Sequence, residues 1–87
     1  MSQSSERAVA LPVDLHARPA GAFAKAAAGF GSAITLAHGE KEVDGRSVLS
    51  VMSLGATAGS EVVVKASGDD AQEAVTALGD LLAAVSA

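Results

Sequence analysis

An alanine-rich stretch constrains the fold more than any other part of this sequence. Seven of the twelve residues at positions 17–28 are alanine, the strongest helix former. Pro19 lies near the start of this stretch, and a helix tolerates proline in its first turn, where the missing N–H group has no helical partner to lose. The sequence therefore predicts a helix that begins within a residue or two of His16 and ends at Gly29 and Gly31.

Segments with the composition of β-strands lie on both sides of this helix. Residues 7–11 alternate weakly between polar and apolar types, and residues 61–66 carry the strongest strand pattern. Two further strands are expected over residues 32–38 and 41–43, joined by a tight hairpin at Gly39–Glu40. The chain therefore supplies four strands.

A short helix is expected between the third and fourth strands. Residues 47–54 begin with Ser47, a preferred N-cap residue, and are followed by Gly55, a common helix stop. The apolar side chains of this segment cover more than one helical face, so a short helix cannot bury all of them against one sheet. Some of the following side chains should therefore be exposed: Val48, Leu49, Val51, Met52 and Leu54.

The last helix is expected to begin near residues 69–70. An acidic residue followed three positions later by Gln or Glu has the spacing of a capping box. Two registers fit this spacing, Asp69 with Gln72 and Asp70 with Glu73. The apolar residues that follow form one helical stripe: Ala71, Ala74, Val75, Leu78, Leu81, Leu82 and Val85.

The order of these elements, β-α-β-β-α-β-α, predicts an α+β fold. Its economical packing is one four-stranded, mostly antiparallel sheet with helices on its apolar face. A chain of 87 residues has room for one domain, which we expect to span residues 1–87 with residues 1–5 as a flexible tail. Because 20 residues are alanine, the core must use few large side chains, including both Phe.

Composition also argues against several classes of function. The absence of cysteine and the presence of only two histidines argue against zinc, iron–sulfur, thiol and disulfide chemistry, and we expect no metal and no cofactor. A net charge of −4 with no aromatic stacking platform argues against nucleic-acid binding. Without a signal sequence or a run of about 20 apolar residues, the chain is expected to be cytoplasmic and not to enter a membrane.

The start of the alanine-rich helix is the candidate functional site. The first N–H groups of a helix are unpaired and its dipole is positive there, so this end favours anions. Arg18 adds a planar guanidinium that can hold two oxygens of a phosphoryl group. The same positive end favours the neutral, nucleophilic form of the His16 ring. Lys25 and Arg46 are expected to add positive charge around the same surface.

Each of these features also has a purely structural interpretation. His16 can serve only to cap a helix, with Arg18 merely solvated. His38 is expected to be an exposed turn residue, and Ser47 is by default only an N-cap. The apolar cluster of the short helix, Val48, Leu49 and Met52, is by default core.

Two motifs resemble those of a known family. Leu15-His16-Ala17-Arg18-Pro19-Ala20 is similar to the active-site motif of HPr, the histidine-containing phosphocarriers of the bacterial phosphoenolpyruvate:sugar phosphotransferase system (PTS). Residues 43–55, Val-Asp-Gly-Arg-Ser-Val-Leu-Ser-Val-Met-Ser-Leu-Gly, resemble the second signature of this family at a fitting separation. The resemblance covers about residues 6–85 and implies the open-faced β-sandwich of HPr.

The resemblance also implies a function without catalysis of its own. A phosphocarrier of this type takes a phosphoryl group from phospho-enzyme I on Nδ1 of His16 and passes it to the enzyme IIA domains of sugar permeases. Arg18 then stabilises the phosphate, and the backbone N–H groups of Ala17 and Arg18 donate to it. The resemblance implies that partners dock on a monomer through Gly21, Lys25, Arg46, Val48, Leu49 and Met52.

The resemblance extends to regulation and leaves alternatives open. Ser47 matches the serine that a dedicated HPr kinase/phosphatase modifies in some bacterial groups, where transcriptional regulators also bind, although Ser50 replaces the usual glycine of kinase-regulated relatives. A paralogue in a nitrogen-related or dihydroxyacetone-kinase phosphorelay would use the same chemistry. A purely regulatory binding module is the third alternative, and His16 argues against it because such relatives lack this histidine.

The loop before His16 departs from the family. Val13 and Asp14 stand where relatives more often have Ser or Asn followed by Gly. Asp14 brings a negative charge close to the expected phosphorylation site. Its carboxylate could contact His16 and orient the ring, or it could simply cap the turn.

Overall fold

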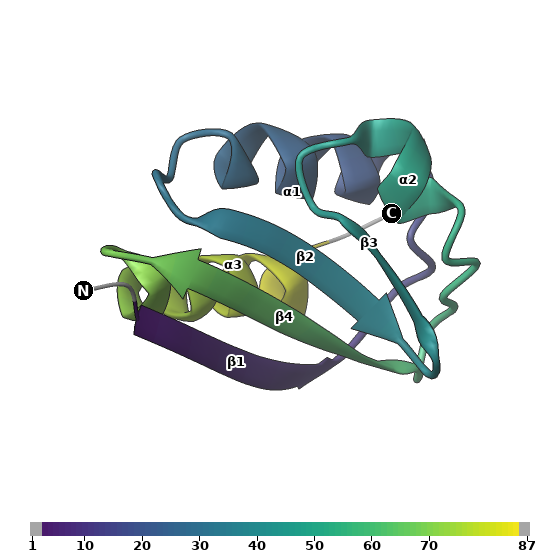
Figure 1. The fold of residues 1–87 in the computed structure, drawn as a ribbon. Coiled ribbons are helices and arrows are strands. Elements are labelled where there is room, and N and C mark those ends of the chain that lie inside the picture. Colours follow the sequence, from purple (N-terminus) through teal and green to yellow (C-terminus); the bar gives the residue numbers. More distant parts are fainter. Residues whose placement is uncertain (1–2, 86–87) are drawn as a thin grey trace.

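A computed structural model of the chain describes residues 3–85 and contains the seven expected elements in the expected order. The α+β fold is therefore confirmed (Figure 1). The elements are β1 (Gln3–Ala10), α1 (Ala17–Ala27), β2 (Ala33–His38), β3 (Lys41–Asp44), α2 (Val48–Met52), β4 (Glu61–Gly68) and α3 (Ala71–Ala84).

The four strands form one antiparallel sheet in the order β1-β4-β2-β3. The two strands at the centre, β4 and β2, alternate in burial, so that Val62 and Val64 of β4 and Ile34 and Leu36 of β2 are buried. These side chains belong to the same apolar cluster as the buried faces of α1 and α3. The sheet is therefore covered by helices on one face, as the sequence predicts.

The core centres on the one fully buried aromatic side chain, Phe23 of α1. Gly45 allows its close approach, because a Cβ atom at position 45 would lie 3.0 Å from Cε1 of Phe23 and 2.8 Å from Cγ2 of Ile34. The other buried residues of α1 are Pro19, Ala20, Ala24 and Ala27. Phe30, which was also expected in the core, lies beyond the helix and is only partly buried against it. Most of the remaining core consists of Val, Leu, Ile and Ala.

The first strand begins earlier than the sequence pattern indicates. Gln3 pairs with Gly68, and the pairing continues without a break to Ala10 opposite Glu61. Residues 3–5 are therefore part of β1, and the expectation of a flexible tail is wrong for them; Met1 and Ser2 lie outside the described residues. The sequence pattern misses residues 3–5 because their side chains are polar and mostly exposed. These residues are held in the sheet by backbone hydrogen bonds, which leave no hydrophobic pattern in the sequence.

The expected capping box of α3 is not formed. Asp70 is the N-cap residue, but its side chain makes no capping hydrogen bond. Its carboxylate instead accepts from the backbone N–H groups of Gly31 and Ser32, each at 2.9 Å, and from the Ser32 hydroxyl. Asp70 therefore ties the start of α3 to the turn that follows α1, which sequence spacing alone does not reveal.

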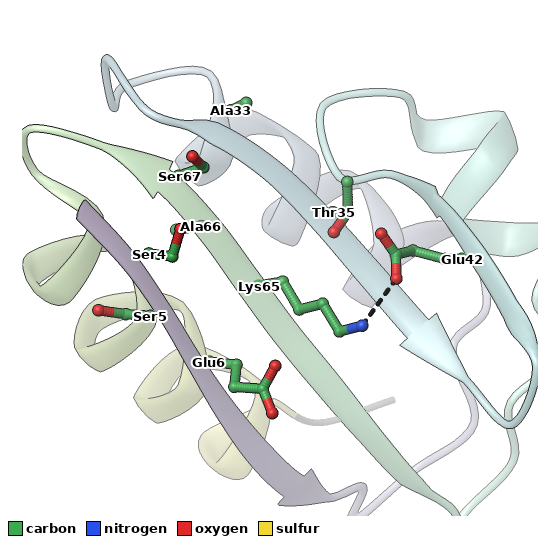
Figure 2. Close-up of a pocket in the computed structure, with 9 residues that line it drawn as sticks. All are labelled: Ser4, Ser5, Glu6, Ala33, Thr35, Glu42, Lys65, Ala66 and Ser67. Atoms are coloured by element: carbon green, nitrogen blue, oxygen red, sulfur yellow. Dashed lines mark hydrogen bonds and ion pairs between the residues drawn. The ribbon is translucent and has the colours of Figure 1, made fainter. Parts of the chain in front are cut away.

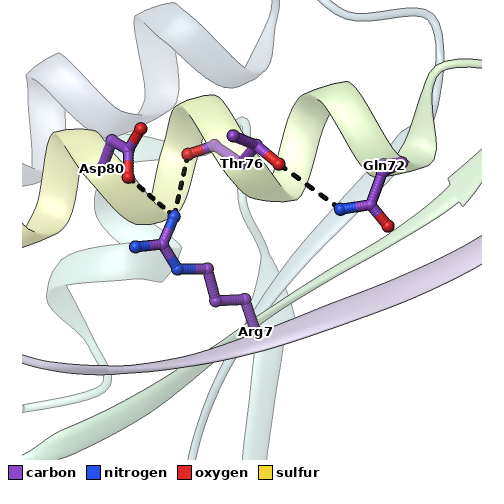
Figure 3. A network of polar contacts seen from close by, with 4 residues as sticks. All are labelled: Arg7, Gln72, Thr76 and Asp80. Carbon is purple, nitrogen blue, oxygen red and sulfur yellow. Dashed lines mark hydrogen bonds and ion pairs between the residues drawn. The ribbon is translucent and has the colours of Figure 1, made fainter.

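A second polar contact holds α3 against the sheet (Figure 3). Arg7 of β1 donates from Nη1 to Asp80 Oδ1 at 2.8 Å and to the carbonyl oxygen of Thr76 at 3.0 Å. Gly79 leaves room for this side chain, because a Cβ atom there would lie 2.6 Å from Cδ of Arg7. Exposed ion pairs of this kind contribute about 0.2–1 kcal/mol.

The face of the sheet opposite the helices carries polar side chains and forms an open groove (Figure 2). Lys65 of β4 and Glu42 of β3 form an ion pair across β2, with 2.9 Å between Nζ and Oε1. The Lys65 ammonium lowers the pKa of Glu42, and Glu42 raises the pKa of Lys65. No helix of the described residues is long and apolar enough to cross a membrane.

The contacts of Asp70 predict an acid-sensitive contribution to stability. Hydrogen bonds from the Ser32 hydroxyl and the Gly31 amide lower the pKa of Asp70 below its ordinary value of 3.8. Stability gained from a lowered pKa is present above the unfolded-state value and is lost as pH falls through the folded-state value. We expect Asp70→Asn to lower the urea midpoint near neutral pH and to weaken its fall between about pH 5 and pH 3.

Glu73→Gln is the matched control, because Glu73 is exposed in the first turn of the same helix. An acid dependence that is the same in Asp70→Asn and in the unmodified protein would contradict this role of Asp70.

Candidate functional site

His16 is the N-cap residue of α1, with an extended backbone at φ −78° and ψ −172°. Its carbonyl oxygen accepts the first helical hydrogen bond, from the Ala20 N–H group at 3.0 Å. Its side chain makes no capping hydrogen bond and is 79% exposed. The expected helix start is confirmed, but the ring itself is not used as a cap.

The loop that presents His16 is held by the segment between α2 and β4. Leu11 of the loop makes two backbone hydrogen bonds to this segment. Its N–H group donates to the Ser60 carbonyl oxygen, and its own carbonyl oxygen accepts from the Gly59 N–H group. Leu15 is buried, and its N–H group donates to the Ala56 carbonyl oxygen at 3.0 Å. The residue before His16 is therefore fixed by both packing and a backbone hydrogen bond.

The first backbone donors of α1 are free. Within residues 3–85, no protein acceptor takes the N–H groups of Ala17 or Arg18. Both residues are exposed, and no carboxylate among the described residues forms an ion pair with Arg18. This helix end thus offers two N–H groups, a guanidinium and a positive dipole worth about 0.3–1 kcal/mol to a bound anion.

Asp14 makes the contact with His16 that was considered from the sequence, but its second contact is with a distant segment. Its Oδ1 atom accepts from the N–H group of Ala58, 44 positions further along the chain, at 2.7 Å. Its Oδ2 atom lies 3.3 Å from Nε2 of His16. The other ring nitrogen of His16, Nδ1, has no hydrogen-bond partner within the part of the chain that the structure describes.

Helix α2 exposes part of its apolar side-chain set. Val48, Leu49 and Met52, which we call the apolar patch, have exposed fractions of 39%, 80% and 37%. Val51 of the same helix is buried, and so is Leu54, which follows the helix. The prediction that α2 could not bury every apolar residue is confirmed, and the alternative that the patch is core is wrong.

The other expected surface residues are positioned by α1 and by the loop before α2. Lys25 is exposed in the last turn of α1, and Gly21, on the same helix, is half-buried. Arg46 is exposed next to α2, its N–H group donating to Asp44 at 3.0 Å. Figure 1 shows α2 beside the end of α1 at which that helix begins.

The start and end of α2 use different caps. Ser47 caps the start, since its hydroxyl oxygen accepts from the Ser50 N–H group at 3.2 Å. At the end, Nζ of Lys41 donates to the Ser53 carbonyl oxygen at 2.6 Å.

His38 is half-buried near the same end of α2, and its Nδ1 atom lies 3.4 Å from the Leu54 carbonyl oxygen. The expectation that His38 is an exposed turn residue is therefore wrong. Lys and His side chains often hydrogen-bond to the last carbonyl groups of a helix. The contacts of Lys41 and His38 were not predicted, because these residues are distant in sequence from the carbonyl groups that they approach.

The chemistry available to this site is that of one exposed imidazole beside anion donors. The described residues contain no group of three or more His, Cys, Asp or Glu side chains that could hold a metal ion. An unblocked Nδ1 atom next to free N–H groups and a guanidinium can form a bond to a phosphoryl group and hold its oxygens.

Comparison with known proteins gives consistent matches over most of the chain. The family described as the PTS HPr component phosphorylation site matches residues 3–84. The phosphocarrier protein HPr of Mycoplasma capricolum is 41% identical over 66 residues, which are 76% of this chain and 74% of that protein.

Solved structures of two Bacillus proteins share the fold. HPr of Bacillus anthracis superposes with a TM-score of 0.81 at 32% identity, covering 93% of this chain and 96% of the other. Crh, described as the Bacillus subtilis catabolite repression HPr, superposes with a TM-score of 0.71 at 32% identity, covering 94% of this chain and 100% of the other.

Proposed function

This chain belongs to the HPr family of PTS phosphocarriers, and we propose that His16 is the residue that carries its phosphoryl group. The protein is a phosphoryl carrier and has no catalytic activity of its own. The observation that carries the proposal is the His16 side chain, 79% exposed, at a helix end whose first N–H groups are free. A carrier must hand its group to other proteins, so an exposed acceptor atom serves it well.

The roles proposed for the neighbouring residues follow from their chemistry. The guanidinium of Arg18 can bind two phosphoryl oxygens at once. The N–H groups of Ala17 and Arg18 lie at the positive end of the α1 dipole and can donate hydrogen bonds to the same dianion. These contacts hold the group without enclosing it. The phosphoryl group therefore stays accessible to the next acceptor.

The family implies partners in the PTS, and we propose enzyme I as the donor and enzyme IIA domains of sugar permeases as the acceptors. Both would dock on the apolar patch, where Leu49 is 80% exposed, and the helix that carries this patch, α2, lies beside the start of α1 (Figure 1). The edge of this surface would consist of Gly21, Lys25 and Arg46. We further propose that the protein works as a cytoplasmic monomer, with residues 1–87 forming one domain.

The similarity to Crh supports a second, regulatory candidate. A regulatory binding module would share the fold and the apolar patch with a carrier. The exposed His16 favours the carrier, because a binding module needs no acceptor atom. A carrier in a paralogous phosphorelay would keep His16 and differ only in its partners.

Phosphate transfer to His16 is the first prediction from this proposal. Enzyme I and labelled phosphoenolpyruvate should place one acid-labile phosphate on the protein. His16→Ala should accept none, because it lacks the acceptor nitrogen. His38→Gln removes the only other histidine of the chain and should still be labelled. Labelled His16→Ala would contradict the assignment.

The apolar patch generates a second prediction. Leu49→Glu should weaken binding to enzyme I by about tenfold or more, because a charge must be desolvated at the centre of the interface. Its free energy of unfolding should change by no more than about 0.5 kcal/mol, because the side chain is 80% exposed.

Ala77→Glu is the matched control, since it adds the same charge at an exposed position of α3. Titration calorimetry measures the affinities. Equal affinity of Leu49→Glu and Ala77→Glu for enzyme I would place the docking surface elsewhere.

We propose that modification of Ser47 regulates docking. Its half-buried hydroxyl lies at the start of α2, directly before the apolar patch, so a phosphate there would place a dianion at the edge of the interface. Ser47→Asp should weaken enzyme I binding in the same calorimetric assay, whereas Ser47→Ala should only loosen the cap. An unchanged affinity for Ser47→Asp would argue against this regulation.

A further inference from the structure

We propose that Asp14 is a positioning residue that keeps the proton of the neutral His16 ring on Nε2 and leaves the Nδ1 lone pair for the phosphoryl group. The inference rests on the proposed role of His16 as the acceptor. It concerns a residue that departs from the family pattern, so it describes a property of this chain.

The Asp14 carboxylate is held in place from the side away from the ring. Its Oδ1 atom accepts from the Ala58 N–H group at 2.7 Å, and the adjacent Leu15 is fixed by the Ala56 carbonyl oxygen. The Asp14 side chain is 42% exposed, against 79% for His16. The carboxylate is therefore the fixed member of the pair, and the imidazole is the member that it orients.

The position of the second carboxylate oxygen selects one tautomer of the ring. Oδ2 of Asp14 lies 3.3 Å from Nε2 of His16, and an ionised carboxylate can only accept hydrogen bonds. A proton on Nε2 is attracted to this oxygen, whereas a lone pair on Nε2 is repelled by it. The neutral ring then carries its lone pair on Nδ1, which has no competing partner within residues 3–85.

The same contact stabilises the product of phosphoryl transfer. The Nδ1 lone pair forms the new nitrogen–phosphorus bond, and the bond between phosphorus and the donor atom of enzyme I breaks, its electron pair remaining on the donor. No proton has to move, because Nε2 already carries one. The ring becomes an imidazolium with its positive charge shared with Nε2, beside the Asp14 carboxylate.

The negative charge of Asp14 also repels the incoming dianion, but this repulsion is limited because the carboxylate and the phosphoryl group lie at different nitrogens of the ring. The carboxylate lies against Nε2, whereas the phosphoryl group bonds to Nδ1, so the carboxylate is closer to the ring charge than to the phosphoryl oxygens. The N–H groups of Ala17 and Arg18 remain free to receive those oxygens.

Asp14→Asn tests the proposal because the asparagine side chain has nearly the same shape but can present a hydrogen-bond donor to Nε2 in place of an acceptor. The amide oxygen can keep the hydrogen bond from Ala58, and the amide NH₂ then faces Nε2, where it favours a lone pair and moves the proton to Nδ1. Nitrogen-15 NMR of the His16 ring in the neutral state reports the two tautomers directly. Glu61→Gln is the control, since it removes the same charge at the exposed start of β4.

We expect the Nε2-protonated tautomer to predominate in the unmodified protein and its ratio to the other tautomer to fall about two- to fivefold in Asp14→Asn, the range expected for an exposed charge pair. The second-order rate of phosphoryl transfer from phospho-enzyme I should fall as well, by a smaller factor, because it follows the fraction of the Nε2-protonated ring and not the ratio of the two tautomers. Glu61→Gln should change neither quantity.

Two results would overturn the proposal. The first is a predominantly Nδ1-protonated ring in the unmodified protein, which needs no variant to detect. The second is a tautomer ratio in Asp14→Asn that equals that of Glu61→Gln. Either result leaves the role of His16 intact, because labelling of His16→Ala tests that role separately.

Discussion

The free backbone donors at the start of α1 are the constraint on which the rest of the site depends. Every helix leaves its first N–H groups without helical partners, and here Ala17 and Arg18 present theirs to solvent. Pro19 contributes no donor of its own, and His16 starts the helix with an extended backbone. A buried helix start would need protein acceptors, and those acceptors would compete with the phosphoryl group that we propose for this site.

The fold fixes this helix end from two directions. The buried face of α1 packs on the sheet through Phe23, which determines how closely the helix approaches β2. Gly45 leaves room for the Phe23 ring next to Ile34 of β2. The loop before the helix is joined to the segment after α2 through Leu15 and Asp14. His16 and the apolar patch are therefore joined through one set of hydrogen bonds, on the surface that we propose for docking.

The sequence predicted those features that depend on neighbouring residues. The seven elements, the start of α1 and the Ser47 cap follow from local composition and spacing, and the structure confirms them. Features that join distant residues were missed or predicted wrongly. Asp70 bonds to the turn at Gly31 instead of capping its own helix, and His38 approaches α2 instead of standing in a solvated turn.

The sequence by itself determined the family, the order of the elements and the identity of the acceptor candidate, because each is encoded in short motifs at fixed spacing. Only the tertiary structure decided which atoms meet. It separated the exposed Leu49 from the buried Val51 within one turn of α2, and it placed Asp14 against Nε2 of His16. The physical reason is that burial and side-chain contact are set by which segments pack together, and residues 14 and 58 are neighbours only after folding.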